Sequence, residues 1–98
     1  MPEIHPRKIR LRGKLWNLCT HPMPNSDGLC EKEPWAPKKH IWIDPSCKGE
    51  YMLDILLHEM LHCCYPDLEE DAIATTARSL AKVLWGLGYR SEELGDED

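Results

Sequence analysis

The 98-residue sequence has no phenylalanine, no Cys-x-x-Cys pair and no long apolar run. Without about 20 consecutive apolar residues no membrane-spanning helix is predicted, and the first residues lack the apolar core of a signal peptide. We therefore expect a soluble, cytoplasmic protein with no membrane partner. The five cysteines are odd in number, so reduced thiols are expected rather than a full disulfide framework. The adjacency of Cys63 and Cys64 also argues against such a framework. Cys19, Cys30 and Cys47, with His21 nearby, are considered as a second zinc site, but none of their spacings matches the Cys-x-x-Cys of structural zinc sites.

Positive charge is in the minority, with 12 Lys and Arg against 17 Asp and Glu and a net charge of −5. This balance argues against an ordinary basic nucleic-acid-binding protein. Five bases do gather between residues 7 and 14, where we interpret them as the solvated face of a strand rather than a phosphate-contacting stripe. The length allows one domain, residues 1–98, of which residues 1–8 and 91–98 are expected to be peripheral or frayed.

Apolar alternation predicts strands in two places. Residues 9–18 alternate on both sides of Gly13, which indicates one strand or a tight pair of strands. Residues 40–43 form a short β-branched and aromatic run that Asp44 and Pro45 close. Turn-forming residues are dense between residues 20 and 38, so we expect one long loop there, either walling a cleft or serving as a passive connector.

Two helices are predicted after these strands. Residues 50–64 are apolar nearly all round, as in a buried helix, and Pro66 cannot continue them. Residues 67–87 are amphipathic, with Asp67 and Glu70 as a capping-box-like start and Gly88 as the stop. The predicted fold class is α+β, with a small antiparallel sheet of two or three strands packed on two helices.

The first predicted helix carries a pattern typical of metal sites. His58 and His62 are four residues apart, so their side chains lie on one face of the helix and can bind one metal ion. Glu59 lies about 100° further round the helix, where it can reach a water molecule beside that ion. A glutamate in this register distinguishes the pair from two structural histidines. The pattern predicts a Zn2+ hydrolase with Glu59 as the catalytic base.

A catalytic zinc takes three protein ligands, and the histidine pair supplies two. On a helical wheel of the second helix, Glu70 lies closest to the centre of the apolar face, ahead of Glu69 and Asp71. Glu70 is therefore the first candidate for the third ligand. Two alternatives stay open: Glu70 only caps its helix, or His21 or His40 supplies the ligand.

Other residues are candidates for supporting roles. Asp54, one turn before His58, either orients a ligand histidine or is a solvated helix residue. The strand Ile41, Trp42 and Ile43 either binds an extended peptide by main-chain pairing or is a plain core strand. An oxyanion needs a further hydrogen-bond donor, for which we consider Tyr65, Tyr89, His40 and Arg78.

The run His58-Glu59-Met60-Leu61-His62 matches the HExxH signature of zinc metallopeptidases, and the acid on the following helix resembles the gluzincin arrangement. With residues 53–57, 66–70 and 84–90, about half of the chain is similar to small phage and bacterial metallopeptidase-like proteins, and distantly to SprT-like and ImmA/IrrE proteins. The resemblance implies a zinc peptidase acting on a peptide or protein, in the host cytoplasm if the protein is viral. Tyr65 and Leu68 stand where a metzincin would have glycine and a third histidine, which excludes that class.

Two alternative functions stay open. A scaffold with this motif can keep zinc for structure alone, as a non-catalytic, zinc-stabilised interaction module. The similarity to SprT-like proteins suggests instead a DNA-associated protease, although the net charge argues against nucleic-acid binding.

Overall fold

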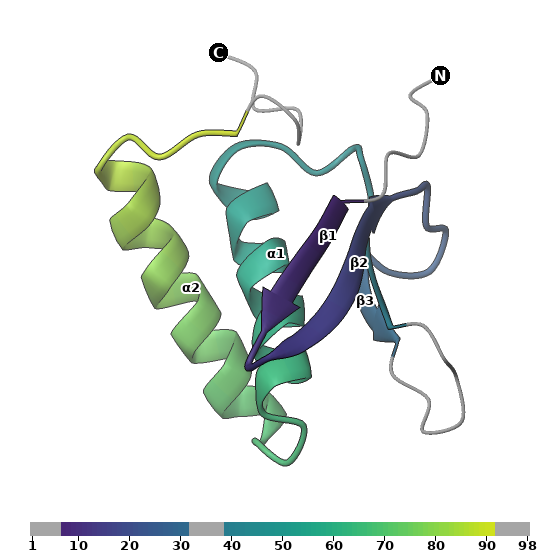
Figure 1. Cartoon of the computed structure of the whole chain (residues 1–98). Helices are drawn as coiled ribbons and strands as arrows, with labels where there is room; N and C mark the ends of the chain where they lie inside the picture. The colour runs from purple at the N-terminus through teal and green to yellow at the C-terminus, as the bar shows by residue number, and fades with distance from the viewer. Residues whose placement is uncertain (1–6, 32–38, 92–98) are drawn as a thin grey trace.

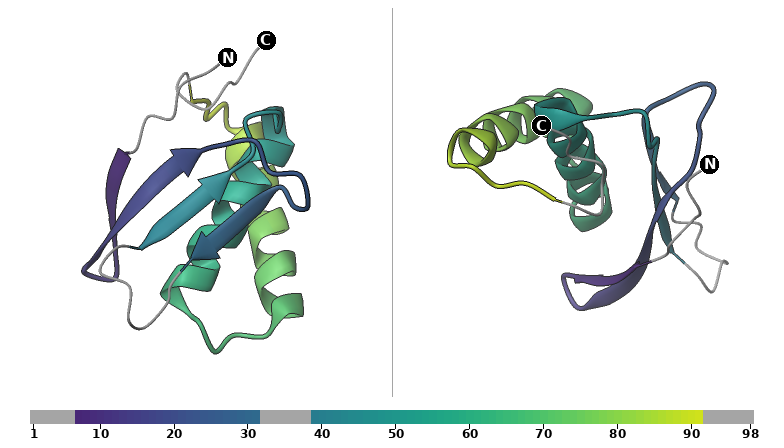
Figure 2. Two further views of the ribbon diagram at one scale, coloured as in Figure 1. Left: turned by 90° about the vertical axis from the view of Figure 1, so that its right-hand side faces the viewer. Right: turned by 90° about the horizontal axis from the view of Figure 1, so that it is seen from above.

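The computed structural model describes residues 7–31 and 39–91 of the chain. A four-stranded sheet, helix α1 and helix α2 form three successive layers (Figures 1 and 2). Among the elements formed by these described residues, α2 contacts α1 but no strand. The α+β class is therefore confirmed, but the sheet has four strands rather than two or three. The elements in chain order are β1 (Arg7–Leu11), β2 (Lys14–Thr20), β3 (Gly28–Glu31), β4 (His40–Ile43), α1 (Gly49–Cys64) and α2 (Glu70–Gly86).

The tight pair of strands predicted around Gly13 is present as the β1–β2 hairpin. The two turn residues, Arg12 and Gly13, have φ values of 51° and 80°. Two positive φ values in a two-residue loop give a backbone twist that matches the right-handed twist of the two flanking strands. Glycine adopts this conformation without a steric cost. Leu11 and Lys14 are accordingly the last paired residues on either side of the turn.

The sheet is mixed, with the strand order β1-β2-β4-β3. β2 and β4 are parallel, whereas β3 pairs antiparallel with the other side of β4. The prediction of an antiparallel sheet was wrong at the β2–β4 pair, and the prediction of one continuous loop over residues 20–38 was wrong because β3 interrupts it. Only four residues long and surrounded by turn formers, β3 has too little alternation to be recognised from the sequence.

The core lies between the inner face of the sheet and α1. Ile41 and Ile43 of β4 are fully buried there, and alternation along the strand turns His40 and Trp42 to the opposite face. On the other side of α1, the buried stripe of α2 consists of Ile73, Ala77 and Ala81.

The ends of α2 differ in how well they were predicted. The helix begins at Glu70 with Glu69 as N-cap and no side-chain capping bond, so the expected Asp67–Glu70 capping box is not formed. At the other end Gly88 has a φ of 96°, and the Gly88 and Tyr89 amides donate to the carbonyls of Trp85 and Leu84. These two bonds are the Schellman motif that a C-terminal glycine indicates.

A disulfide joins Cys30 of β3 to Cys63 of α1, whose Cα atoms are 6.3 Å apart. The expectation that all thiols are reduced was therefore wrong for this pair, while Cys19, Cys47 and Cys64 are free. Within residues 7–31 and 39–91, no helix has the length and apolar character needed to cross a bilayer.

Candidate metal centre

His58 and His62 lie in the second half of α1, on the face that also meets the start of α2. Their Nε2 atoms are 3.1 Å apart and their ring centroids 4.8 Å apart. This proximity follows from the helical period, which stacks residues i and i+4 on one face. Their side chains are 19% and 30% exposed, so the site is open to solvent but the rings are packed.

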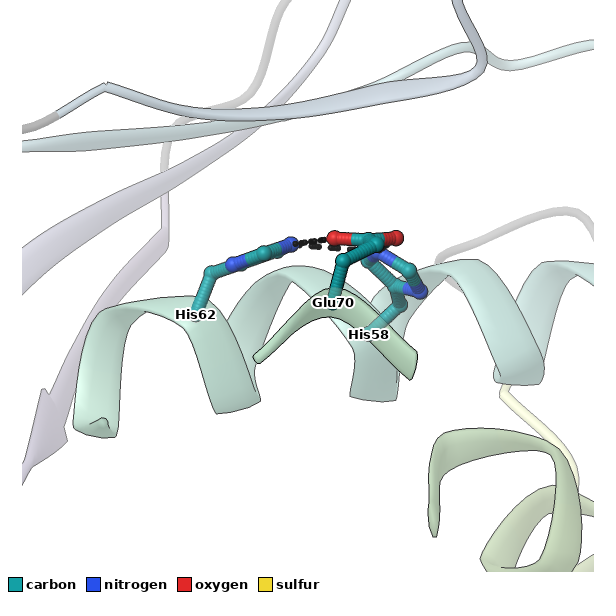
Figure 3. A group of neighbouring side chains, drawn as sticks. All are labelled: His58, His62 and Glu70. Atoms are coloured by element: carbon teal, nitrogen blue, oxygen red, sulfur yellow. Dashed lines mark hydrogen bonds and ion pairs between the residues drawn. The ribbon is translucent and has the colours of Figure 1, made fainter. Parts of the chain in front are cut away.

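Glu70 reaches the two histidines because the connection between the helices is short. At the end of α1 the Tyr65 amide donates a hydrogen bond to the Leu61 carbonyl, and the Leu68 amide then donates one to the Tyr65 carbonyl. The chain therefore reverses its direction within five residues. Glu70 is the first residue of α2, and its two oxygens lie 3.0 Å from His58 Nε2 and 3.0 Å from His62 Nε2 (Figure 3). The residue ranked first on the helical wheel is thus the acid that meets the histidines.

These three side chains can hold a metal ion. Their donor atoms all lie within 4.8 Å of one another, and no other group of this kind is found in the described part of the chain, which leaves Glu69, Asp71 and the cysteines outside it. Ligands in a tetrahedral zinc shell with bonds of 2.0–2.1 Å are about 3.3 Å apart, close to the spacing here. Two imidazole nitrogens and a carboxylate are also the donor set of an open zinc site.

Glu59 is the only buried charged residue among those described, with 9% of its surface exposed. Burial raises the pKa of its carboxyl, and the nearby His58 and His62 counteract that shift. The backbone of Cys30 in β3 also lowers the pKa of the carboxyl. Glu59 is therefore held beside the histidine pair, on the side of α1 that faces β3.

The two other histidines considered as ligands lie elsewhere. His40 stacks on Trp42 at 5.2 Å between ring centroids, and His21 meets the same ring edge-on at 5.9 Å. Because Trp42 is on the face of the sheet opposite the helices, neither histidine approaches His58. His40 is thus wrong both as third ligand and as oxyanion donor.

The remaining candidates for supporting roles are not gathered at the site. The Tyr65 ring lies under the Arg12 guanidinium, at 5.0 Å. Tyr89 lines a small apolar pocket with residues of the first half of α1, and Arg78 is exposed two turns beyond Glu70, about 12 Å along α2. Asp54 makes no hydrogen bond to either histidine within the described residues.

The interpretation of Ile41, Trp42 and Ile43 as a substrate strand was wrong. They belong to β4, whose two edges are already paired with β2 and β3. Main-chain pairing with a peptide requires a free edge. Of the described strands, β3 is the one that ends the sheet on the side of the metal centre.

The contribution of β3, which supplies Gly28 and Cys30 to the surroundings of Glu59, was not predicted from the sequence. A weak signal was present, since Gly28 precedes Leu29 and Cys30 in a stretch without proline. Comparison with protein-family models, curated proteins and solved structures found no match to this chain. The function proposed for it therefore depends on the chemistry and geometry of these residues.

Proposed function

We propose that this protein is a zinc-dependent peptidase in which His58, His62 and Glu70 bind the metal and Glu59 is the general base. The observation that supports it most is the convergence of three metal-donor side chains from two helices, with a buried carboxyl beside them. Residues that merely stabilise a helix pair need neither feature, since two imidazoles and a carboxylate could be replaced by apolar side chains.

A zinc ion held by His58, His62 and Glu70 would lower the pKa of a bound water towards about 7 and would polarise a substrate carbonyl. Glu59 accepts the proton of the attacking water and later delivers it to the leaving amine. The buried environment suits this role, because it raises the pKa of the carboxyl and so makes it a better proton acceptor than an exposed glutamate.

The substrate class we propose, an extended peptide, is supported by the position of β3. This strand packs on α1 beside Glu59, and no described strand pairs with its outer edge. An extended peptide can add to such an edge by main-chain hydrogen bonds, which recognise a polypeptide of any sequence. Alternation places Leu29 on the outer face of the sheet, 46% exposed, away from Glu59.

The test is hydrolysis of unfolded casein and of a mixed fluorogenic peptide set by the zinc-loaded protein. Glu59→Gln keeps the size of the side chain but removes the base, and we expect activity to fall about 10²–10⁴-fold with the zinc content unchanged. Asp54→Asn, a carboxylate-to-amide change on the same helix, is the matched control and should retain activity. Undiminished hydrolysis by Glu59→Gln contradicts the mechanism.

A second candidate function, a zinc-stabilised interaction module, is supported by the location of Glu70 at the start of α2. A metal bound there would join the two helices, and metal binding that orders a small domain contributes directly to its stability. This function predicts equimolar zinc, a large loss of thermal stability on chelation and no hydrolysis by the wild-type protein.

A further inference from the structure

β3 lies along a single stripe of α1. Ile55, Glu59 and Cys63 are each four residues apart, so they follow one face of the helix. Gly28 lies over the first two, and Cys30 is bonded to the third. Since alternate strand residues share a face, Gly28 and Cys30 both point at α1 and Leu29 points away.

Gly28 makes an unusually close approach to the proposed base. A Cβ atom at this position would lie 2.8 Å from Ile55 Cγ2, 3.0 Å from Glu59 Cγ and 3.2 Å from Glu59 Oε2. Apolar carbon atoms pack at about 3.5–4.0 Å, so a side chain here could fit only if β3, Ile55 or Glu59 moved. The backbone of Gly28 is not in the left-handed region, so conformational freedom does not explain the glycine.

We propose that Gly28 is a positioning residue for Glu59. This inference deepens the proposed peptidase function and depends on it. Without a side chain, the strand backbone lies directly against the glutamate and limits its rotamers. Cys30, on the same face of β3, is bonded to Cys63, one turn after Glu59, and so fixes the strand on this stripe of α1. An ordered carboxyl matters because displacing a catalytic group by about 1 Å can lower the rate about 10²-fold.

Gly28→Ala tests the proposal, and Gly86→Ala is its matched control because nothing lies within 4 Å of a Cβ atom at Gly86. For zinc-loaded Gly28→Ala we expect equimolar zinc, KM within about twofold of wild type and kcat lower by about 10–100-fold. If Gly28 had a merely structural role, its substitution would not lower kcat while leaving KM and the zinc content unchanged. Gly86→Ala should keep all three values.

A second variant separates the two contacts of the added methyl group. Ile55→Ala removes the nearest atom, Ile55 Cγ2, and leaves the contacts to Glu59 at 3.0 and 3.2 Å. In Gly28→Ala/Ile55→Ala we expect kcat to stay at least tenfold below that of Ile55→Ala alone. This comparison also decides the matter if Gly28→Ala by itself does not fold, since the added space relieves its most severe clash.

Four results would overturn the proposal. Wild-type kcat in Gly28→Ala, or recovery of the Ile55→Ala rate in the double variant, would show that Gly28 does not act through Glu59. Loss of zinc by folded Gly28→Ala would assign it a structural role instead. Absence of hydrolysis in the wild-type protein would overturn the peptidase function as well, whereas hydrolysis lost in Glu59→Gln but kept in Gly28→Ala overturns the positioning role alone.

Discussion

Removal of the Cys30–Cys63 disulfide should strongly destabilise the protein, because this bond is the covalent link between β3 and α1. The perturbation is the double substitution Cys30→Ser/Cys63→Ser, which preserves the size of both side chains and leaves the three free cysteines in place. β3 is four residues long and pairs with β4 alone among the described strands, so few main-chain hydrogen bonds hold it in the sheet.

The magnitude follows from the loop that the bond closes. The two cysteines are separated by 33 residues. Cross-linking a loop of that size lowers the entropy of the unfolded chain, which corresponds to about 4 kcal/mol of stability at 25 °C. For a domain of about 100 residues, each kcal/mol shifts the melting temperature by about 4–8 °C, so a decrease of about 15–30 °C is expected.

The assay is thermal unfolding followed by circular dichroism without reductant. Cys64→Ser is the matched control, because Cys64 is adjacent to Cys63 but free, and its melting temperature should stay close to that of the wild type. Thiol titration of the unfolded wild-type protein should detect Cys19, Cys47 and Cys64 before reduction and all five cysteines after it.

Two results would contradict this prediction. Detection of all five thiols in unreduced, freshly purified protein would show that the bond does not form in solution. A melting temperature of the double variant within about 5 °C of the wild type would show that the link contributes less than about 1 kcal/mol.

Three further predictions concern the ligand, a titrating pair and the core. Glu70→Gln should weaken zinc binding by about 100-fold or more in competition with a chromogenic chelator, whereas Glu69→Gln should not change it. The hydrogen bond to Asp27 raises the pKa of Tyr51 to about 12, above its ordinary 10.0. The stability that this bond contributes is thus complete below pH 10 and is lost as the pH rises to about 12. Over that interval the melting temperature of Tyr51→Phe should decrease less than that of the wild type, and an equal decrease would contradict the prediction. Ile73→Ala, at a fully buried position, should lower the free energy of unfolding in urea by about 2–5 kcal/mol, and a loss below about 1 kcal/mol would contradict its place in the core.

Local patterns predicted the elements that depend on neighbouring residues. The β1–β2 hairpin follows from alternation on both sides of Gly13, and α1 was predicted to within one residue because its apolar residues continue until the chain reaches Pro66. Gly88 likewise ended α2 as predicted, since a left-handed C-terminal residue satisfies the last carbonyls of the helix.

Features that depend on pairing across the chain were missed. The four residues of β3 carry almost no periodic signal, so the sequence predicts a loop there. Whether β4 has the free edge that a substrate strand needs could not be predicted, because strand order is decided by packing and not by the residues of one strand. The same reason applies to the disulfide, since an odd number of cysteines does not indicate which pair the fold brings together.

The helical period alone predicts the face shared by His58 and His62 and the place of Glu59 beside it, because it relates residues that are close in the chain. It also ranked Glu70 above Glu69 and Asp71. Only the tertiary structure decided that the turn after α1 brings Glu70 within 3.0 Å of both histidines, and that β3 covers Glu59. These contacts join separate elements, so their distances arise from how the layers pack.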